Sequence, residues 1–420
     1  MDNRPTGRRR FLKNGVALAR FGLAGLAIGG ARSARGQTNG SETAAASPKD
    51  LRAYGERSRF ETSARTYVSG EPNTYAPIQD YDGIITPSSL HYVFTRGITP
   101  MDIDPREHRL LIHGMVDRPL IFTMDDLKRF PAVSRIHFIE CVANTAPTRG
   151  RANYETVQER FGKSSCSEWT GVPLSTVLKE CGVKKGASWL LAESADKIRH
   201  SMSITMEKAM DDALLAYGQN GEAVRPDQGY PLRLLVPGWE GVRNVKWLSR
   251  IQVGDTPFMT HIEIGTNASL RKDGKARWFN LEMGPKSVIT RPSGGQRLLD
   301  KGFHEITGLA WSGGGAIRKV EVSTDGGRTW NDAQLQEPVL RIAHTRFRFP
   351  WKWNGDEAVL QSRCTDERGI VQPSLVEFAN IWGVKPDYFR TTTNSVIHFN
   401  PIQPWKVTRE GSVKNVIWEV

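Results

Sequence analysis

The chain has 420 residues, enough for two or three domains at about 150 residues each. Hydrophobic residues make up 39% and charged residues 24%, a globular composition that excludes a disordered or low-complexity chain. The formal net charge is +12, but residues 1–36 contribute +7 of it, from eight basic side chains and one acidic. The remaining +5 is spread over the rest of the chain without a run of Lys or Arg, so we expect no nucleic-acid partner.

The first 36 residues have the layout of a secretory signal. Two adjacent arginines, Arg8 and Arg9, precede a modestly apolar stretch at residues 16–30. The stretch is too short to span a bilayer and no other run approaches 18 apolar residues, so we expect no membrane segment in the mature protein. The arginine pair resembles the twin-arginine export signal, whose route carries folded proteins. We predict a signal peptide over residues 1–36, a periplasmic location and a cofactor inserted before export; the alternative is a basic disordered tail.

Three further segments differ in their patterns. Residues 37–80, which begin rich in Ala, Ser, Lys and Glu, predict a linker or N-terminal extension. Residues 81–284 alternate short strand and short helix patterns, which predicts a mixed α+β domain. Residues 285–420 lose the helical period and show strands between Gly, Pro, Asn and Asp turns, which predicts a β-sandwich without helices. The predicted fold class is α+β.

Individual elements follow from periodicity and turn residues. The mixed domain is predicted to contain strands at 109–116, 134–141, 230–236 and 246–254 and helices at 124–130 and 170–178. The sandwich is predicted to contain strands at 305–311, 319–324, 341–350 and 358–365. Residues 323–330 match a hairpin motif of sialidase propellers. The motif occurs once, whereas a propeller would repeat it at a fixed period, so it predicts a single structural hairpin.

The four cysteines, Cys141, Cys166, Cys181 and Cys364, lack the short paired spacings of zinc sites, and no Cys-x-x-Cys-His motif for covalent haem is present. We expect one disulfide at most. Cys141 is the last residue of the predicted strand at 134–141 and would place a single thiolate at the end of a rigid element. This position suits one bond to a soft, high-valent metal, although a buried small hydrophobic residue is the alternative.

A second chemical signal surrounds Arg233, a charged residue in an otherwise apolar strand. An unpaired buried charge is costly, so Arg233 is expected to meet an anion. A glycine loop at residues 237–241 follows, close to Arg243 and Lys246. Exposed backbone N–H groups together with these cations can hold a phosphate. Structural salt bridges are the alternative interpretation.

Several separate motifs together resemble the sulfite oxidase family of molybdopterin enzymes. They are residues 229–248, Cys141 at its strand end, residues 168–174, and residues 310–313 with 319–330. Within that family, residues 111–120 and 135–141 are similar to the molybdenum subunits of sulfane dehydrogenases. The resemblance covers roughly residues 80–420. It implies molybdenum carried by a pyranopterin (molybdopterin), a mixed α+β cofactor domain at residues 81–284 and an immunoglobulin-like dimerisation domain at residues 285–420.

The resemblance also implies roles for individual residues. Cys141 would be the metal ligand and would act in catalysis together with Arg96. Cofactor binding would fall to Arg233, Asn244 and Lys246, assisted by Arg243, with Asp196, Tyr92 and Gln228 at further cofactor positions. Gln228 stands where the family has a histidine.

The substrate pocket departs from the family pattern. Phe94 and Ala146 stand where sulfite oxidases place arginines, and Gly274 stands where a tyrosine is expected. Arg96 keeps its charge, and Arg149 and Arg151 are the next arginines after Cys141. The departures imply a pocket with less positive charge and more room than one that binds free sulfite.

The resemblance therefore implies an enzyme that transfers an oxygen atom at molybdenum to sulfane sulfur on a carrier protein. Electrons would pass to a c-type cytochrome subunit, and two such chains would pair within a heterotetramer. The enzymatic alternative is oxidation of free sulfite with a cytochrome acceptor. The non-enzymatic alternative is an exported β-rich binding protein.

Overall fold

The computed structural model describes residues 57–67, 73–96, 98–145, 154–265, 267–271, 273–279, 281–391 and 397–419. Residues 57–420 form one compact unit. The predicted signal peptide over residues 1–36 lies outside the described residues. None of the described helices has the length and apolar character needed to cross a bilayer.

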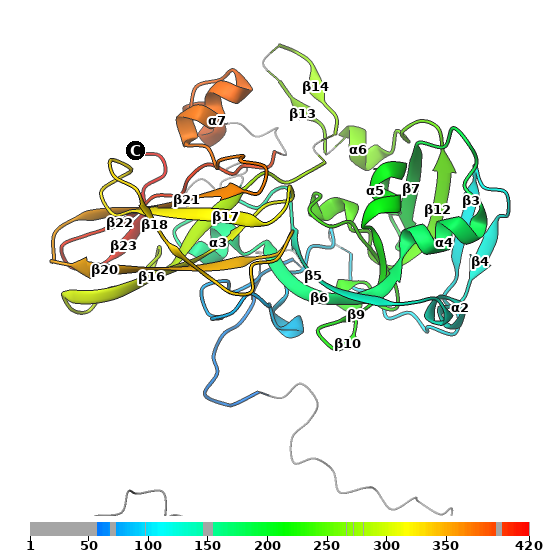
Figure 1. The fold of residues 1–420 in the computed structure, drawn as a ribbon, viewed down its shortest axis with the longest axis horizontal. Coiled ribbons are helices and arrows are strands. Elements are labelled where there is room, and N and C mark those ends of the chain that lie inside the picture. The colour runs from blue at the N-terminus through cyan, green and yellow to red at the C-terminus, as the bar shows by residue number, and fades with distance from the viewer. Residues whose placement is uncertain are drawn as a thin grey trace, which may run out of the picture. The chain divides into compact units, whose positions relative to one another are not determined.

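The first half of the compact unit is a mixed α+β body, as predicted (Figure 1). Two five-stranded sheets form it, one in the order β4-β3-β12-β7-β8 and the other in the order β10-β9-β6-β5 with β11 paired to β9. The strands are β3 Leu110–Gly114, β4 Leu120–Phe122, β5 Val133–Glu140, β6 Ser164–Pro173, β7 Trp189–Ser194, β8 Ser201–Thr205, β9 Leu214–Gln219, β10 Glu222–Ala223, β11 Arg233–Leu235 and β12 Leu248–Gly254.

Short helices connect these strands. They are η1 Ser88–Leu90, α2 Met124–Arg129, α3 Val157–Phe161, α4 Leu174–Cys181, α5 Met206–Asp211, η3 Pro226–Gln228, η4 Gly241–Arg243 and α6 His261–Gly265. Thr123 begins α2 with a capping box to Asp126, which confirms the predicted helix. The predicted helix over residues 170–178 is wrong in its first half. Thr170 and Val172 pair with β9, so the strand runs to Pro173 and α4 begins after it.

The second half is built from two sheets, β15-β16-β20-β19 and β18-β17-β21-β22-β23. Their strands are β15 Lys286–Arg291, β16 Gly302–Trp311, β17 Ile317–Ser323, β18 Asn331–Asp332, β19 Gln334–Gln336, β20 Thr345–Trp353, β21 Ala358–Asp366, β22 Trp405–Val407 and β23 Val413–Asn415. Short antiparallel pairs occur elsewhere, β1 Thr66–Tyr67 with β2 Thr74–Tyr75 and β13 Ser269–Leu270 with β14 Ala276–Arg277.

The prediction that this half contains no helix is wrong. Two helices are present, α7 Leu375–Trp382 and α8 Asp387–Thr391. Ser374 begins α7 with a capping box to Glu377, and Gly383 ends it in the left-handed conformation. The helix has only eight residues, so it is too short to impose a helical period on the surrounding strand-rich sequence.

The predicted hairpin at residues 323–330 is confirmed. It joins β17 to β18, which pair antiparallel. Gly326 and Gly327 have φ of 78° and 88°, and the Gly327 N–H donates to Ser323 Oγ at 2.8 Å. The Trp330 indole N–H donates to the Gly327 carbonyl at 3.0 Å. These hydrogen bonds lie within the turn itself, so residues 323–330 have a structural role as a hairpin.

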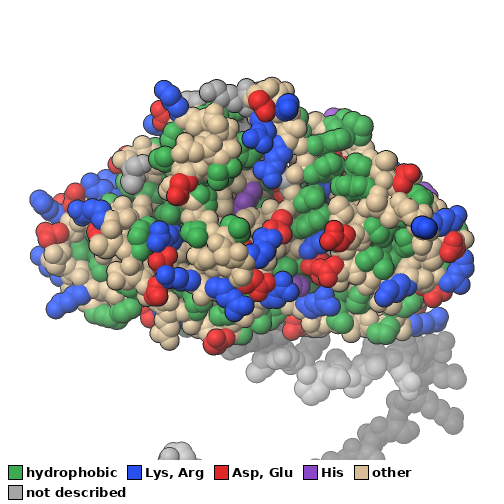
Figure 2. Space-filling model, turned by 45° about the horizontal axis from the view of Figure 1, so that its top comes forward, with side chains coloured by type: hydrophobic (Ala, Val, Ile, Leu, Met, Phe, Trp, Pro, Cys, Tyr) green, Lys and Arg blue, Asp and Glu red, His purple; other side chains and the backbone are tan. Residues whose placement is uncertain are grey.

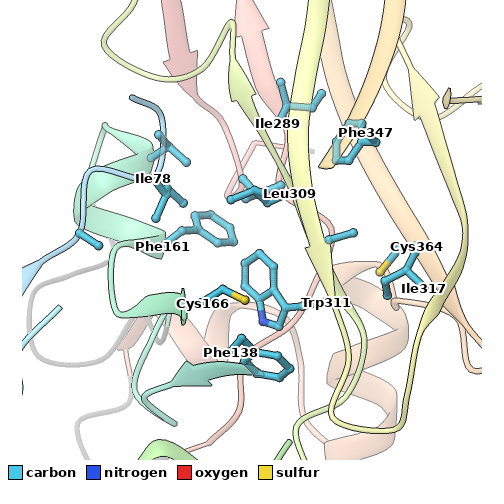
Figure 3. Close-up of a cluster of buried hydrophobic side chains, with 14 of the residues drawn as sticks. Ile78, Phe138, Phe161, Cys166, Ile289, Leu309, Trp311, Ile317, Phe347 and Cys364 are labelled. Carbon is cyan, nitrogen blue, oxygen red and sulfur yellow. The ribbon is translucent and has the colours of Figure 1, made fainter. Parts of the chain in front are cut away.

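One hydrophobic core extends across both halves. Phe138 and Cys166 of the first half lie beside Trp311 of β16 (Figure 3). Ala76 and Ile78 belong to the same core and are fully buried, so the predicted linker at residues 37–80 ends before these residues. The boundary at residues 284 and 285 stays a prediction, because residues 57–420 form a single compact unit.

Charged side chains of both signs are interspersed on the face of the molecule that Figure 2 shows, with hydrophobic side chains between them. The exposed hydrophobic side chains of the described residues include Met259 and Ile264 around α6 and Val376 and Ile381 on α7. This face therefore presents no continuous field of basic charge.

Candidate functional site

Cys141 lies directly after β5, one residue past the strand end and not at its last position as predicted, and the residue is only 8% exposed. The Cys141 N–H donates to the Lys163 carbonyl at 2.9 Å, and the Asn144 N–H donates to the Cys141 carbonyl at 2.8 Å. All four cysteines are buried free thiols. The chain therefore holds the Cys141 thiol in a tight turn at the end of a strand anchored in the core.

Tyr92 lies beside this turn. Its side chain is 6% exposed, and burial together with the neighbouring Cys141 raises the pKa of its hydroxyl well above the usual value. Gly241 packs against Glu140 and Tyr92. A Cβ at position 241 would lie 2.7 Å from the Glu140 carbonyl oxygen and 2.9 Å from the Tyr92 hydroxyl. Glycine at position 241 is what allows the loop to approach the strand end so closely.

Gln228 links Tyr92 to Arg233. The Gln228 side-chain amide donates to the Tyr92 carbonyl at 2.9 Å. Arg233 Nη1 donates to the Gln228 carbonyl at 2.9 Å, and Nη2 donates to the Asn244 carbonyl at 3.3 Å. The guanidinium carbon lies 4.8 Å from the centre of the Trp169 ring, while Nε finds no hydrogen-bond partner within the described part of the chain. Arg233 thus meets carbonyl oxygens and an aromatic ring, and keeps one buried donor unused.

Lys246 adds a second cation to the same place. Its Nζ donates to the Asp227 carbonyl at 2.7 Å and to the Phe94 carbonyl at 3.2 Å. Burial, with the nearby Arg233, lowers the pKa of Lys246 to about 7. Arg65 is ion-paired with Asp227 at 2.7 Å, so three cations surround one carboxylate among the described residues. This excess of positive charge, with an unused Arg233 donor, fits the phosphate of a molybdopterin.

Two predicted cofactor residues have structural partners. The Asn244 side chain accepts from the Val236 N–H at 2.8 Å and donates to the Glu240 carbonyl at 3.3 Å. Arg243 forms a fully buried ion pair with Glu263 at 3.0 Å, the alternative that the sequence left open. The structure therefore does not bring Arg243 into the Arg233 cluster, and the cofactor roles of Asn244 and Arg243 stay predictions.

Two backbone N–H groups of the glycine loop at residues 237–241 already have partners within the chain. Those of Trp239 and Glu240 donate to backbone carbonyls, as do those of Arg243 and Asn244 after the loop. Gly238 instead permits close packing, because a Cβ there would lie 2.6 Å from the Gly313 carbonyl. Trp239 and Glu240 therefore offer no backbone N–H to a phosphate, and the rest of the cradle stays a prediction.

Asp196 and Arg96 meet around His200, which the sequence analysis did not single out. The Asp196 carboxylate accepts from the backbone N–H of His200 at 3.2 Å. Asp196, Arg96 and Lys246 all act electrostatically on the His200 imidazole. Arg96 also interacts with the Cys141 thiol, and its Nη2 donates to Asn267 at 3.0 Å. Arg96 thus lies within electrostatic reach of both Cys141 and His200.

The positions that depart from the family pattern are only partly described. Phe94 packs on the core, and its ring lies 5.3 Å from Lys163 Nζ. Gly274 lies in the exposed turn between β13 and β14, where a Cβ would meet no atom within 4 Å, so it does not line a wall. Ala146, Arg149 and Arg151 lie outside the described residues.

No three His, Cys, Asp or Glu side chains gather as a metal cage in the described ranges. Trp169 is the residue that the sequence analysis could have used: it stands in the 168–174 motif and stacks on Arg233. His200 and Asp227 carry no comparable sequence signal. Their role becomes visible only when the chain is folded.

The lowered pKa of Lys246 predicts a pH-dependent anion site. Sulfate keeps its charge between about pH 6 and about pH 9, so its affinity for the cofactor-free protein should fall as Lys246 loses its proton on passing about pH 7. His91 and His200, whose pKa values burial lowers to about 3 and about 4, stay neutral throughout. Titration calorimetry with sulfate measures the effect. A Lys246→Met variant should bind sulfate with the same affinity across this pH range. If the affinity in that variant still falls near pH 7, Lys246 is not the group responsible.

Two family models match the chain. Residues 96–262 match the oxidoreductase molybdopterin binding domain, and residues 277–396 match the Mo-co oxidoreductase dimerisation domain. The two matches follow the predicted order of a mixed cofactor domain and an immunoglobulin-like β-rich dimerisation domain, and confirm the predicted fold class.

Individual relatives are of two kinds. An NADH nitrate reductase of Ulva prolifera is 34% identical over 60% of this chain and 32% of its own length. A second, from Phaseolus vulgaris, is 34% identical over 79% of this chain and 43% of its own. The chain therefore spans less than half the length of these relatives. The solved structure of the sulfane dehydrogenase SoxCD from Paracoccus pantotrophus is 40% identical, with a TM-score of 0.82, covering 87% of this chain and 94% of the matched one.

Proposed function

The chain belongs to the sulfite oxidase family of molybdopterin oxidoreductases, and from this premise we propose that it oxidises sulfane sulfur bound to a carrier protein. The observation that carries the proposal is a buried free thiol, Cys141, in a tight turn, with Tyr92 in electrostatic reach of both this thiol and the buried Arg233. Support for the substrate class comes from the 40% identity to a sulfane dehydrogenase. Family membership sets the non-enzymatic alternative aside.

The site residues suit a molybdenum–pyranopterin cofactor, which when bound supplies two-electron oxygen-atom transfer to sulfur. Cys141 Sγ would hold the metal as its one protein thiolate. Arg233 and Lys246 would neutralise the cofactor phosphate, and Gln228 keeps the Arg233 guanidinium in place from the Tyr92 side. Asp196 and Tyr92 complete the proposed cofactor set.

Arg96 is the proposed substrate-side group. It interacts electrostatically with the Cys141 thiol, and burial lowers the pKa of its guanidinium without removing its charge near neutral pH. A fixed cation at this point would orient a sulfur group and neutralise the negative charge that builds on it as it is oxidised. Cys141 and Arg96 are the residues that we place at the reacting centre.

The charge of the pocket favours carrier-bound sulfur over free sulfite. Free sulfite is a small dianion near neutral pH, and its binding requires several converging cationic donors that replace its hydration. Phe94 stands at one position where sulfite oxidases place an arginine, and in the structure it packs on the core and supplies no charge. Arg96 serves a sulfur group that a carrier protein presents and orients better than it serves a free dianion.

We expect kcat/KM for carrier-bound sulfane sulfur to exceed that for free sulfite by at least about tenfold, the ratio that the loss of one charge-assisted hydrogen bond produces. Steady-state assays of the molybdenum-loaded protein with a cytochrome c acceptor measure both. Nitrate reduction, assayed with a reduced dye, is the third arm because of the nitrate reductase relatives. Equal or higher efficiency with sulfite favours the alternative, a sulfite:cytochrome c oxidoreductase.

We also propose an electron acceptor, an oligomeric state and a cellular location for this chain. Two-electron oxidation must be followed by single-electron transfer, and the sequence has no Cys-x-x-Cys-His haem motif, so a c-type cytochrome subunit is the proposed acceptor. The matched dimerisation domain supports a homodimer of this chain within a heterotetramer. Residues 1–36 would direct the folded, cofactor-loaded chain to the periplasm by the twin-arginine route.

A further inference from the structure

A fully buried ion pair lies next to the proposed metal ligand. Lys286 Nζ and Glu140 Oε1 are 2.5 Å apart, and both side chains are 0% exposed. Glu140 immediately precedes Cys141, whereas Lys286 is the first residue of β15, 146 residues further along the chain. The pair therefore joins the strand that carries the thiol to the first strand of the sandwich.

The Glu140 carboxylate accepts two further hydrogen bonds, one from the Cys141 turn and one from the sandwich. Asn144, three residues after the thiol, donates to Oε1 at 2.9 Å, and the Trp311 indole donates to Oε2 at 2.8 Å. Lys286 also donates to Thr145 Oγ1 at 3.1 Å. The residues that flank the Cys141 turn are thus bonded to one carboxylate and one ammonium.

Burial makes this arrangement rigid and specific. A carboxylate removed from water is tolerated only when it is paired and fully hydrogen-bonded, which three donors on Glu140 achieve. Trp311 lies in the core between the two halves (Figure 3), so one donor is itself fixed by packing. The Cys141 thiol interacts electrostatically with Lys286 as well.

We propose that Lys286 is a positioning residue for the metal-ligating cysteine: acting through Glu140 and Thr145, it lets the first strand of the sandwich fix the Cys141 turn. The inference rests on the proposed function only in taking Cys141 as the molybdenum ligand. Groups that orient a metal's ligands typically alter affinity or activity by about 10- to 100-fold when removed. Lys286 does so from outside the matched cofactor domain.

The test compares molybdenum retention and the electron paramagnetic resonance signal of the half-reduced metal in the full-length, loaded protein. Lys286→Met should lose molybdenum during dialysis about 10- to 100-fold faster than the unmodified protein and should show a shifted or heterogeneous signal. Arg346→Met is the matched control. Arg346 is a buried cation of β20 that donates to the Tyr81 and Gly83 carbonyls, and its loss should leave the signal and retention native.

Lys286→Met leaves the buried Glu140 carboxylate without its ion-pair partner, which can prevent folding. A double variant, Glu140→Gln with Lys286→Met, removes both charges and is tested if the single variant does not fold. The double variant should also show the altered signal and faster loss, because the pair that fixes the turn is gone. Native retention and a native signal in either variant overturn the inference. Failure of the proposed function is separate: the unmodified protein would then bind no molybdenum, or Cys141→Ser would retain it.

Discussion

Cys141→Ser is expected to abolish sulfur oxidation and to leave the protein with little molybdenum, while the fold survives. A neutral hydroxyl is a far poorer ligand for a soft, high-valent metal than a thiolate. The fold should persist because the exchange replaces sulfur by oxygen in a side chain that forms no disulfide and is already 8% exposed. Elemental analysis of metal per chain, together with thermal unfolding, measures both effects.

The matched control is Cys181→Ser. Cys181 is also a buried free thiol, but it ends α4 and packs in a second hydrophobic cluster, with Leu178 and Leu190, that does not include Cys141. A hydroxyl there should cost about 1–3 kcal/mol of stability, because it is buried without a designed partner, and should leave molybdenum content unchanged. Full activity or full metal content in purified Cys141→Ser would refute Cys141 as the ligand.

The strand that delivers Cys141 was predictable to within one residue. Its alternation of side chains is a local property, and the structure places β5 at Val133–Glu140 against the predicted 134–141. The end of β6 was not predictable in the same way. Thr170 and Val172 are strand residues because they pair with Gly218 and Leu215 of β9, and this partner lies far along the chain. Local periodicity does not encode such pairing.

The same distinction explains the site. The sequence pointed to Arg233 because a charge in an apolar strand needs a partner, and the structure confirms that Arg233 is buried and bonded. It could not show that Gln228 reaches Tyr92 across 136 residues, or that Arg243 turns to Glu263. Residue types indicate what chemistry is possible. Only the tertiary contacts decide which cations lie together in one site and which form structural ion pairs elsewhere.

Arg233→Met should produce the second large effect, a protein that folds but binds the cofactor roughly 10- to 150-fold more weakly, the equivalent of about 1.5–3 kcal/mol for a charge-assisted hydrogen bond. Methionine can occupy the space over the Trp169 ring, with which the guanidinium now stacks at 4.8 Å, so packing is largely preserved. What is lost is one of the three cations around Asp227 and the donors to the Gln228 and Asn244 carbonyls.

Two further variants separate the effect of the positive charge at position 233 from the effect of its hydrogen-bond geometry. Arg233→Lys keeps a cation but cannot make the forked bonds to the Gln228 and Asn244 carbonyls, so cofactor content should fall between those of the unmodified protein and Arg233→Met. Arg225→Met removes a more exposed arginine paired with Glu222 and should leave cofactor content unchanged, because surface ion pairs contribute little. Pterin fluorescence and molybdenum per chain measure the series. If Arg233→Met retains its full cofactor, the buried cation is structural, and the phosphate must be held by Lys246 and groups elsewhere in the chain.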